Sequence, residues 1–240
     1  GIDTNLVLRD SAAVTPEYAA VVSPAGELIA GLADMRAVET IGVADVEARW
    51  PQLAQAQWIF ADCNLPADVL RWIVERANGD GIRLAVDAVS EPKVCKLPDD
   101  LTGVDLIVLN EREAAVYLYE DAGIFAALPL ADRAGRIRER GARNVVLTMG
   151  ERGVATACEQ GVQHVRALAT HIVDTTGGSD ALCAGVLYGL VRGQTLQEAA
   201  RIGSLAAALT VESPRTVRPD LSLSLLELHA KRMDEAWTLL

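Results

Sequence analysis

The sequence has little positive charge, no long apolar run and no secretion signal. Its 240 residues carry 22 lysines and arginines against 33 aspartates and glutamates, which gives a formal net charge of −11 at pH 7. Because this charge repels nucleic acids and anionic membranes, we expect neither as a partner. No apolar run is long enough to cross a bilayer and no signal-peptide pattern is present, so we expect a cytoplasmic protein.

Cysteine and histidine are scarce and show no metal-binding pattern. The four cysteines are Cys63, Cys95, Cys158 and Cys183. The absence of C-x-x-C spacing is typical of proteins whose thiols are reduced. We interpret the four cysteines as small apolar residues that fill space. The three histidines are His164, His171 and His229. None has ligand spacing with cysteines or carboxylates, so we expect structural roles for all three.

The composition allows one large α/β domain, since 50% of the residues are hydrophobic and 23% are charged. From residue 57 onward, apolar runs alternate with helical patterns, which predicts a mostly parallel sheet flanked by helices. The predicted strands cover residues 58–64, 83–90, 105–110, 144–150, 153–159 and 162–168. The predicted helices cover residues 66–78, 111–120, 131–141, 180–191, 196–211 and 225–240. A ligand should lie beyond the carboxyl ends of the parallel strands.

The first segment has a different pattern. Two apolar runs, EYAAVVSP and ELIAGLADM, are separated by the turn signal Pro24-Ala25-Gly26, which predicts a hairpin in a small sheet. The alternative is that these strands form an edge of the main sheet. We therefore divide the chain into residues 1–40, with the small sheet and its connections, and residues 41–240, with the α/β domain.

The most informative stretch is residues 171–190, HIVDTTGGSDALCAGVLYGL. A β-branched run meets Gly177 and Gly178, whose flexibility allows backbone N–H groups to face one point, and the following helix adds the positive end of its dipole. This predicts an anion socket with Asp180 at its mouth, where a carboxylate can accept the proton of an attacking hydroxyl. The alternative is an ordinary turn in which Ser179 or Asp180 only caps the helix.

This stretch resembles the C-terminal signature of the ribokinase-like carbohydrate and nucleoside kinases, the PfkB family, usually written D-T-x-G-A-G-D. The resemblance implies a ribokinase-like α/β fold with a small β lid, and ATP and Mg²⁺ as cofactors. It also implies that Asp180 is the catalytic base and that the backbone of Gly177, Gly178 and Ser179 stabilises the transferred phosphoryl group. The chain departs from the pattern at Gly178, which replaces alanine, and at Ser179, which replaces glycine and adds a side chain close to the phosphate.

Two further motifs fit the resemblance. Asn110 and Glu113 form N-x-x-E, which in the family helps to place Mg²⁺ and the nucleotide phosphates. The resemblance implies that Glu113 contacts Mg²⁺ through water. Taken alone, Asn110 is a helix cap and Glu113 complements the helix dipole. Thr148, Gly150 and Gly153 match the family's nucleotide-binding T-x-G-x-x-G, although a plain hairpin turn explains them equally well.

The resemblance also implies a monovalent cation site. In many family members the residues at Asp174 and Thr176 help to bind such an ion, which would be K⁺ here. The other half of the site should fall in residues 213–217, and SPRTV lacks the glycine and small residues expected there. Dependence on K⁺ is left open.

Segments ADCN and DAVSEPK narrow the resemblance to the pseudouridine kinase branch of the family, and the lid strands agree with it. The implied substrate-binding residues are Thr15, Tyr18, Asn64, Asp87 and Lys93. The lysines just beyond the strand, Lys93 and Lys96, would neutralise phosphate charge, although loop lysines are more often solvated surface groups.

The expected function is therefore an ATP-dependent kinase that phosphorylates the 5′-hydroxyl of a nucleoside or sugar, with pseudouridine preferred. The alternatives are another sugar or nucleoside kinase of the same fold, or a catalytically inactive nucleotide-binding subunit. Family lids often pack together, so we expect a homodimer. The sequence begins where a family member would already have supplied its first strand and a G-G-x-x-x-N sugar-binding segment, so we expect either a truncated sequence or a reduced sugar site.

Overall fold

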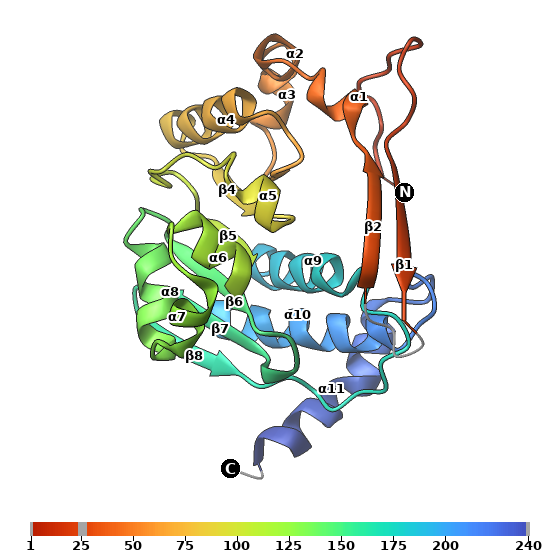
Figure 1. Ribbon diagram of the computed structural model, residues 1–240, viewed down its shortest axis with the longest axis vertical. Helices are drawn as coiled ribbons and strands as arrows, with labels where there is room; N and C mark the ends of the chain where they lie inside the picture. Colours follow the sequence, from red (N-terminus) through yellow and green to blue (C-terminus); the bar gives the residue numbers. More distant parts are fainter. Residues whose placement is uncertain (1, 24–27, 239–240) are drawn as a thin grey trace.

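The computed structural model describes residues 2–23 and 28–238 and contains two separate sheets (Figure 1). The larger sheet has six strands in sequence order, and β3 to β6 are parallel while β7 and β8 are antiparallel to their neighbours. Its strands are β3 Trp58–Asp62, β4 Arg83–Asp87, β5 Leu106–Asn110, β6 Asn144–Thr148, β7 Val154–Cys158 and β8 Gly161–Val165. The mostly parallel central sheet expected from the sequence is confirmed.

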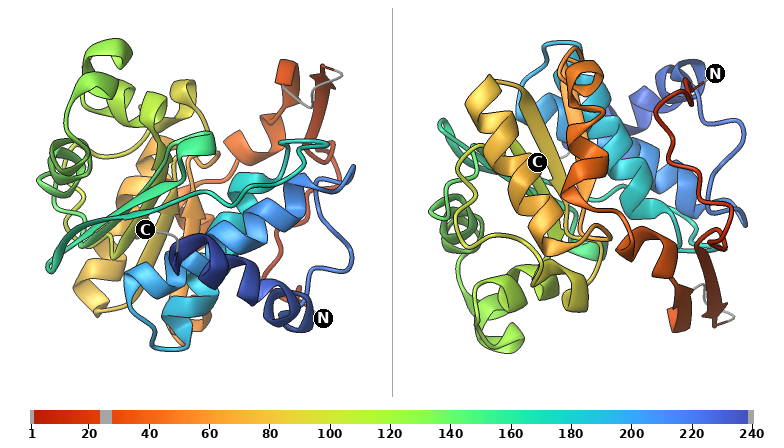
Figure 2. Two further views of the ribbon diagram at one scale, coloured as in Figure 1. Left: turned by 90° about the horizontal axis from the view of Figure 1, so that it is seen from below. Right: turned by 90° about the horizontal axis from the view of Figure 1, so that it is seen from above.

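Both faces of this sheet are covered, and strand β5 shows why. Ile107 and Leu109 belong to one buried apolar cluster, while Leu106 and Val108 belong to another. Since alternate side chains of a strand point to opposite faces, a continuous apolar run fits a sheet with helices on both sides. Figure 2 (right) shows α4 on one side of the strands and the pair α9 and α10 on the other.

The first cluster receives side chains of α4 Ala67–Asp80, α6 Glu111–Tyr117 and α8 Leu130–Arg138. The second receives side chains of α9 Gly178–Val191 and α10 Leu196–Val211. The remaining helices are α1 Arg36–Glu39, α2 Val43–Glu47, α3 Trp50–Leu53, α5 Glu91–Val94, α7 Ala122–Ala127, α11 Leu223–Thr238 and the 3₁₀ turn η1 Gly150–Arg152.

Helices α9 and α10 run side by side because small residues line their contact. A Cβ added to Gly185 would lie 2.6 Å from the Cα of Gly203, and one added to Gly203 would lie 2.6 Å from the Leu182 carbonyl oxygen. The two backbones are therefore too close for larger side chains. This packing fixes the position of the N-terminal end of α9.

The small sheet consists of β1 Glu17–Val22 and β2 Leu28–Asp34, paired antiparallel and not bonded to the main sheet. It stands beyond the ends of α9 and α10 in Figure 1. The predicted hairpin strands are therefore confirmed, and the alternative of an edge of the main sheet is wrong. The predicted turn at Pro24-Ala25-Gly26 lies outside the described residues.

The predicted start of the signature helix is wrong, because α9 begins at Gly178 rather than Asp180. The β-branched run Ile172–Val173 before it lies outside the strands. The N–H groups of Val173 and Asp174 both donate to the Val211 carbonyl, at 2.8 and 3.2 Å, instead of pairing with a neighbouring strand.

The cysteines also differ from the expectation. All four thiols are free, but only Cys63 and Cys183 are buried, while Cys95 is exposed and Cys158 is partly exposed. The interpretation as an apolar filler therefore fails for Cys95, whereas Cys158 packs against the second apolar cluster. Within residues 2–23 and 28–238, no helix has the length and apolarity that crossing a membrane requires.

Candidate active site

A cavity of about 670 Å³ lies against the N-terminal end of α9. Thr148, Gly150 and Gly153 line it from the turn between β6 and β7, and Gly178 and Ser179 line it from the helix. Its volume is typical of small-molecule sites. The two glycine motifs, far apart in the sequence, therefore meet at one cavity.

The start of α9 presents free backbone donors. Gly177, in the left-handed conformation with φ of +84°, is the N-cap, and Gly178 N–H donates to the Thr175 carbonyl at 3.2 Å. Among the described residues, no hydrogen bond uses the N–H of Ser179 or Asp180. Free N–H groups and the helix dipole together favour an anion at this place.

Gly177 also lies in close contact with the segment of residues 213–217. A Cβ at this position would overlap the Thr216 carbonyl oxygen, so the turn and residues 213–217 are in close contact. The Asp174 Oδ1 atom accepts the Thr176 N–H at 2.8 Å and orders the turn from the other side. The two halves of the expected cation site therefore lie together, and K⁺ binding stays a prediction.

Helix α10 contributes a residue that the sequence did not single out. Ser204 lines the cavity and is only 6% exposed, and its Oγ has no hydrogen-bond partner in the part of the chain that the structure describes. Since a buried hydroxyl without a partner is costly, it is a ready contact for a ligand. The only signal for it in the sequence was a single serine within a run of small apolar residues.

A second group of polar residues gathers where β3 and β4 end. The Asn64 side chain donates to Asp62 Oδ2 at 2.9 Å and accepts from Lys93 Nζ at 2.5 Å. Lys96 Nζ donates to the Asn64 carbonyl at 3.0 Å. Both lysines are half-buried, so the reading of them as solvated surface groups is wrong. Nothing in the sequence indicated that both lysines donate hydrogen bonds to Asn64.

Asp87 lies at the end of β4 against helix α9. Its Oδ2 is 3.0 Å from the Cys183 thiol, which donates, and its Oδ1 accepts the Val89 N–H at 2.7 Å. Burial raises the pKa of the Asp87 carboxyl, and the charges of Asp180 and Asp62 raise it further. Val89 has a φ of +66°, a strained conformation for a β-branched residue. Cys183 is thus a neighbour of the site, not merely filler.

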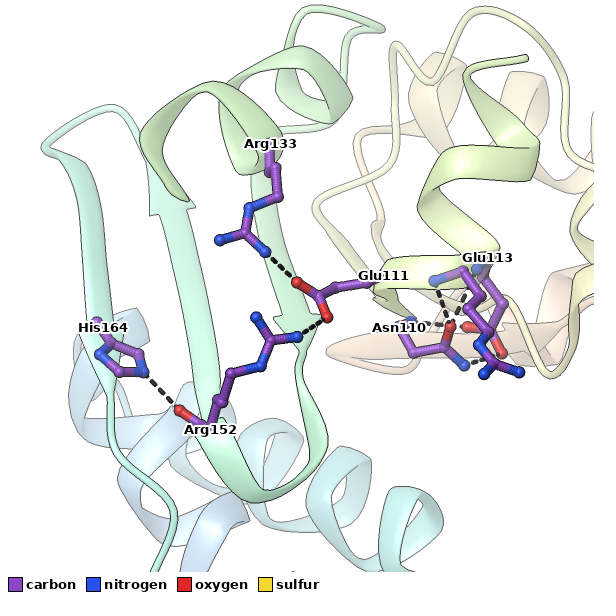
Figure 3. A network of polar contacts seen from close by, with 7 residues as sticks. Asn110, Glu111, Glu113, Arg133, Arg152 and His164 are labelled. Atoms are coloured by element: carbon purple, nitrogen blue, oxygen red, sulfur yellow. Dashed lines mark hydrogen bonds and ion pairs between the residues drawn. The ribbon is translucent and has the colours of Figure 1, made fainter. Parts of the chain in front are cut away.

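Asn110 and Glu113 form a complete capping box at the start of α6 (Figure 3). Glu113 Oε2 accepts the Asn110 N–H at 2.8 Å, Oε1 accepts the Asn110 amide at 2.7 Å, and Asn110 Oδ1 accepts the Glu113 N–H at 3.0 Å. Burial raises the pKa of Glu113, as does the nearby charge of Asp87. Neither residue lines the 670 Å³ cavity. The geometry accounts for both as caps, and a role in metal binding stays a prediction.

The two lid residues lie apart from these groups. Thr15 precedes β1 and Tyr18 lies within it, and both are exposed. The Tyr18 ring packs over Gly31 of β2, where an added Cβ would lie 2.5 Å from the hydroxyl. Among the described residues, no hydrogen bond joins Thr15 or Tyr18 to Asn64 or Asp87.

The sequence matches the pfkB family of carbohydrate kinases over residues 1–222. The chain belongs to this family. Its pseudouridine kinase relative from Escherichia coli strain K12 is 26% identical over 211 residues, which are 88% of this chain and 66% of that protein. A cytidine kinase from Thermococcus kodakarensis is 36% identical over 152 residues, covering 60% of this chain and 52% of that protein.

Solved structures of kinases share the family fold. A carbohydrate kinase from Agrobacterium tumefaciens matches with a TM-score of 0.74 at 27% identity, over 92% of this chain and 70% of that one. A ribokinase from Thermotoga maritima, at 18% identity and a TM-score of 0.71 over 90% of this chain and 70% of that one, confirms the ribokinase-like fold. The chain spans just under two thirds of the length of the pseudouridine kinase that it matches.

Proposed function

We propose that this pfkB family protein transfers the γ-phosphoryl group of ATP to a hydroxyl of a nucleoside or sugar. The observation that carries the proposal is the position of Asp180 between two sites. Its neighbour Ser179 lines the 670 Å³ cavity, and Cys183, three residues further along α9, donates a hydrogen bond to Asp87 in the strand-end group. A carboxylate between a nucleotide and an acceptor is placed to serve as general base.

The cavity suits the nucleotide. We assign the triphosphate to the N–H groups at the start of α9, and the ribose to the turn that contains Gly150 and Gly153. Ser204 would then donate a hydrogen bond to the base from the far wall. As the phosphoryl group moves, the unused N–H groups of Ser179 and Asp180 would stabilise its charge.

The residues present fit a Mg²⁺ ion that arrives with the nucleotide. In the described part of the chain, no three acidic, histidine or cysteine side chains form a metal cage. Mg²⁺ is commonly held by one or two carboxylates together with substrate phosphates and water. Glu113 would contribute through water, because Asn110 already donates to both of its oxygens. When bound, the ion would neutralise phosphate charge, and Asp174 and Thr176 would hold a K⁺ ion beside the anion socket at the start of α9.

The acceptor we favour is pseudouridine, bound by Asn64, Asp87 and Lys93 at the strand ends, with Thr15 and Tyr18 closing over it from the lid. The E. coli relative that carries this name supports the choice. Asp180 would take the proton of the 5′-hydroxyl of the acceptor. The 5′-oxygen would attack the γ-phosphorus of ATP, and ADP would leave. The products are pseudouridine 5′-phosphate and ADP.

The lid is the proposed contact with a second copy of the chain. Tyr18, Val21, Ile29 and Leu32 are 50 to 70% exposed on this two-stranded sheet. A two-stranded sheet with exposed apolar side chains is marginal alone and suited to pairing with another copy. Light scattering should give the mass of a dimer, and a monomer would contradict this part of the proposal.

The test is a coupled assay of ADP release with pseudouridine, uridine and ribose as acceptors. The expected result is turnover with pseudouridine that exceeds turnover with the other two. Equal or greater turnover on ribose would favour another kinase of the fold. ATP binding without turnover on any acceptor would favour a catalytically inactive subunit.

A further inference from the structure

We infer that a second anion-binding site lies beside the nucleotide cavity, between α8, the β6–β7 turn and β8. A separate cavity of about 390 Å³ at this place is lined by Arg133, Arg152, Arg166 and His164, with Glu151 as its acidic member. The site would take an anion of phosphate size and geometry. It is distinct from the free N–H groups of α9, because none of the α9 residues lines it.

The charge balance of this cavity is opposite to that of the chain. The carboxylate of Glu111 is shared by Arg133 and Arg152, whose guanidinium groups approach it from two sides (Figure 3). Even with Glu111 and Glu151 counted, three arginines leave a positive charge uncompensated. In a protein with a formal net charge of −11, this local positive excess favours binding of a negative ligand.

Arg133 supplies the observation that points to a ligand. It is only 8% exposed, and its Nε has no hydrogen-bond partner among the residues that the structure describes. Burying a guanidinium N–H without a partner is costly, and a bound anion would remove that cost. Arg166 is exposed and makes no hydrogen bond or ion pair within the described ranges, so it is also available.

The wall of the cavity is already ordered. The Nε2 of His164 is 2.6 Å from the Arg152 carbonyl oxygen, and because a carbonyl only accepts, Nε2 donates. This bond ties β8 to the turn that carries Arg152. Planar guanidinium groups held in place suit the tetrahedral oxygens of phosphate, either free or as a monoester. Glu151 and Ala167 line both cavities, so the anion would lie next to the nucleotide.

The test follows the arginine Nε–Hε signals in ¹H–¹⁵N NMR spectra of the intact chain during addition of inorganic phosphate, then of glycerol 3-phosphate. Sodium chloride at the same ionic strength is the control. The Arg133 signal, assigned by its loss in Arg133→Lys, should shift and saturate. A response to glycerol 3-phosphate alone would support the site and identify the ligand as a phosphate monoester.

Affinity measurements on exposed variants test the site without disturbing the core. Arg166→Ala should weaken phosphate binding by about tenfold or more, as expected for a lost charge-assisted hydrogen bond. The matched control Arg138→Ala removes an exposed arginine of α8 whose side chain, among the described residues, donates only to the Arg143 carbonyl, and it should leave binding unchanged. The inference is overturned if the arginine signals respond to phosphate no more than to chloride, or if both variants weaken binding equally. If Arg133→Lys does not fold, the comparison of Arg166→Ala with Arg138→Ala still tests whether the anion site exists.

Discussion

Replacing Gly177 with alanine should destabilise the protein more than any neighbouring glycine substitution. Two features of the structure combine at this residue. Its φ of +84° lies in the left-handed region, and an added Cβ would overlap the carbonyl oxygen of Thr216. The methyl group cannot avoid that oxygen by rotation, because both atoms are fixed to the backbone.

The two costs have separate magnitudes. A left-handed conformation costs a non-glycine residue about 1–2 kcal/mol. Displacing a packed neighbour costs about 1–3 kcal/mol more. The free energy of unfolding should therefore fall by about 2–5 kcal/mol, which lowers the thermal midpoint of a chain of this size by at least about 4 °C.

Two control variants separate these costs. Gly193 has a φ of +80° but no atom within 4 Å of an added Cβ, so Gly193→Ala measures the backbone cost alone. Gly178 has no positive φ, and its added Cβ would lie 2.9 Å from Cγ1 of Val211, a side chain that can turn away. Gly178→Ala should therefore cost less than Gly177→Ala.

The assay is thermal and urea unfolding of the three variants, together with ATP titration. We expect Gly177→Ala to be the least stable and to bind ATP more weakly, because the turn that presents the N–H groups is displaced. If Gly177→Ala is as stable as Gly193→Ala, the contact with Thr216 is not rigid. The account of the anion socket would then be wrong.

Three further substitutions test individual residues. Ser179→Gly should not lower turnover, and a large loss of rate would show that the hydroxyl contributes. Ser204→Ala should weaken ATP binding about two- to tenfold with no loss of thermal stability, since it would remove the proposed contact with the nucleotide and Ser204 Oγ has no partner within the described part of the chain. Asp87→Asn should raise the free energy of unfolding at pH 7, because burial raises the pKa of Asp87 in the folded state and its ionised form is therefore disfavoured there. That gain should vanish as the pH falls below about 4, where the carboxyl is protonated in both states, and urea unfolding at several pH values would show whether it does.

The main sheet was predictable because its strands leave a local pattern. An uninterrupted apolar run such as residues 106–109, in a chain where such runs alternate with helical patterns, fits a strand buried on both faces. Short helices were not predictable. Helices α1, α2 and α3 have four or five residues each, too few to show a helical period.

The site was predictable in its motifs but not in its contacts. Residues Gly150 and Ser179 each belong to a recognisable local pattern, and the structure shows that they line one cavity. The bond between Asp87 and Cys183 joins residues 96 positions apart and depends on where α9 packs against the sheet. No local pattern could indicate it. The same holds for the arginines around Glu111, which come from separate elements.

The measurement that tests the central claim most directly compares the wild-type chain with Asp180→Asn in ATP binding and in single-turnover phosphoryl transfer to pseudouridine. Asp180 lies in the first turn of α9, next to the cavity residue Ser179, and its side chain is exposed, so replacing its carboxylate with an amide should leave folding and ATP affinity nearly unchanged. Loss of a general base should slow transfer by about 10²–10⁴-fold. A variant that binds ATP as the wild type does and transfers the phosphoryl group at the wild-type rate would contradict the account, because Asp180 would then be only a helix residue.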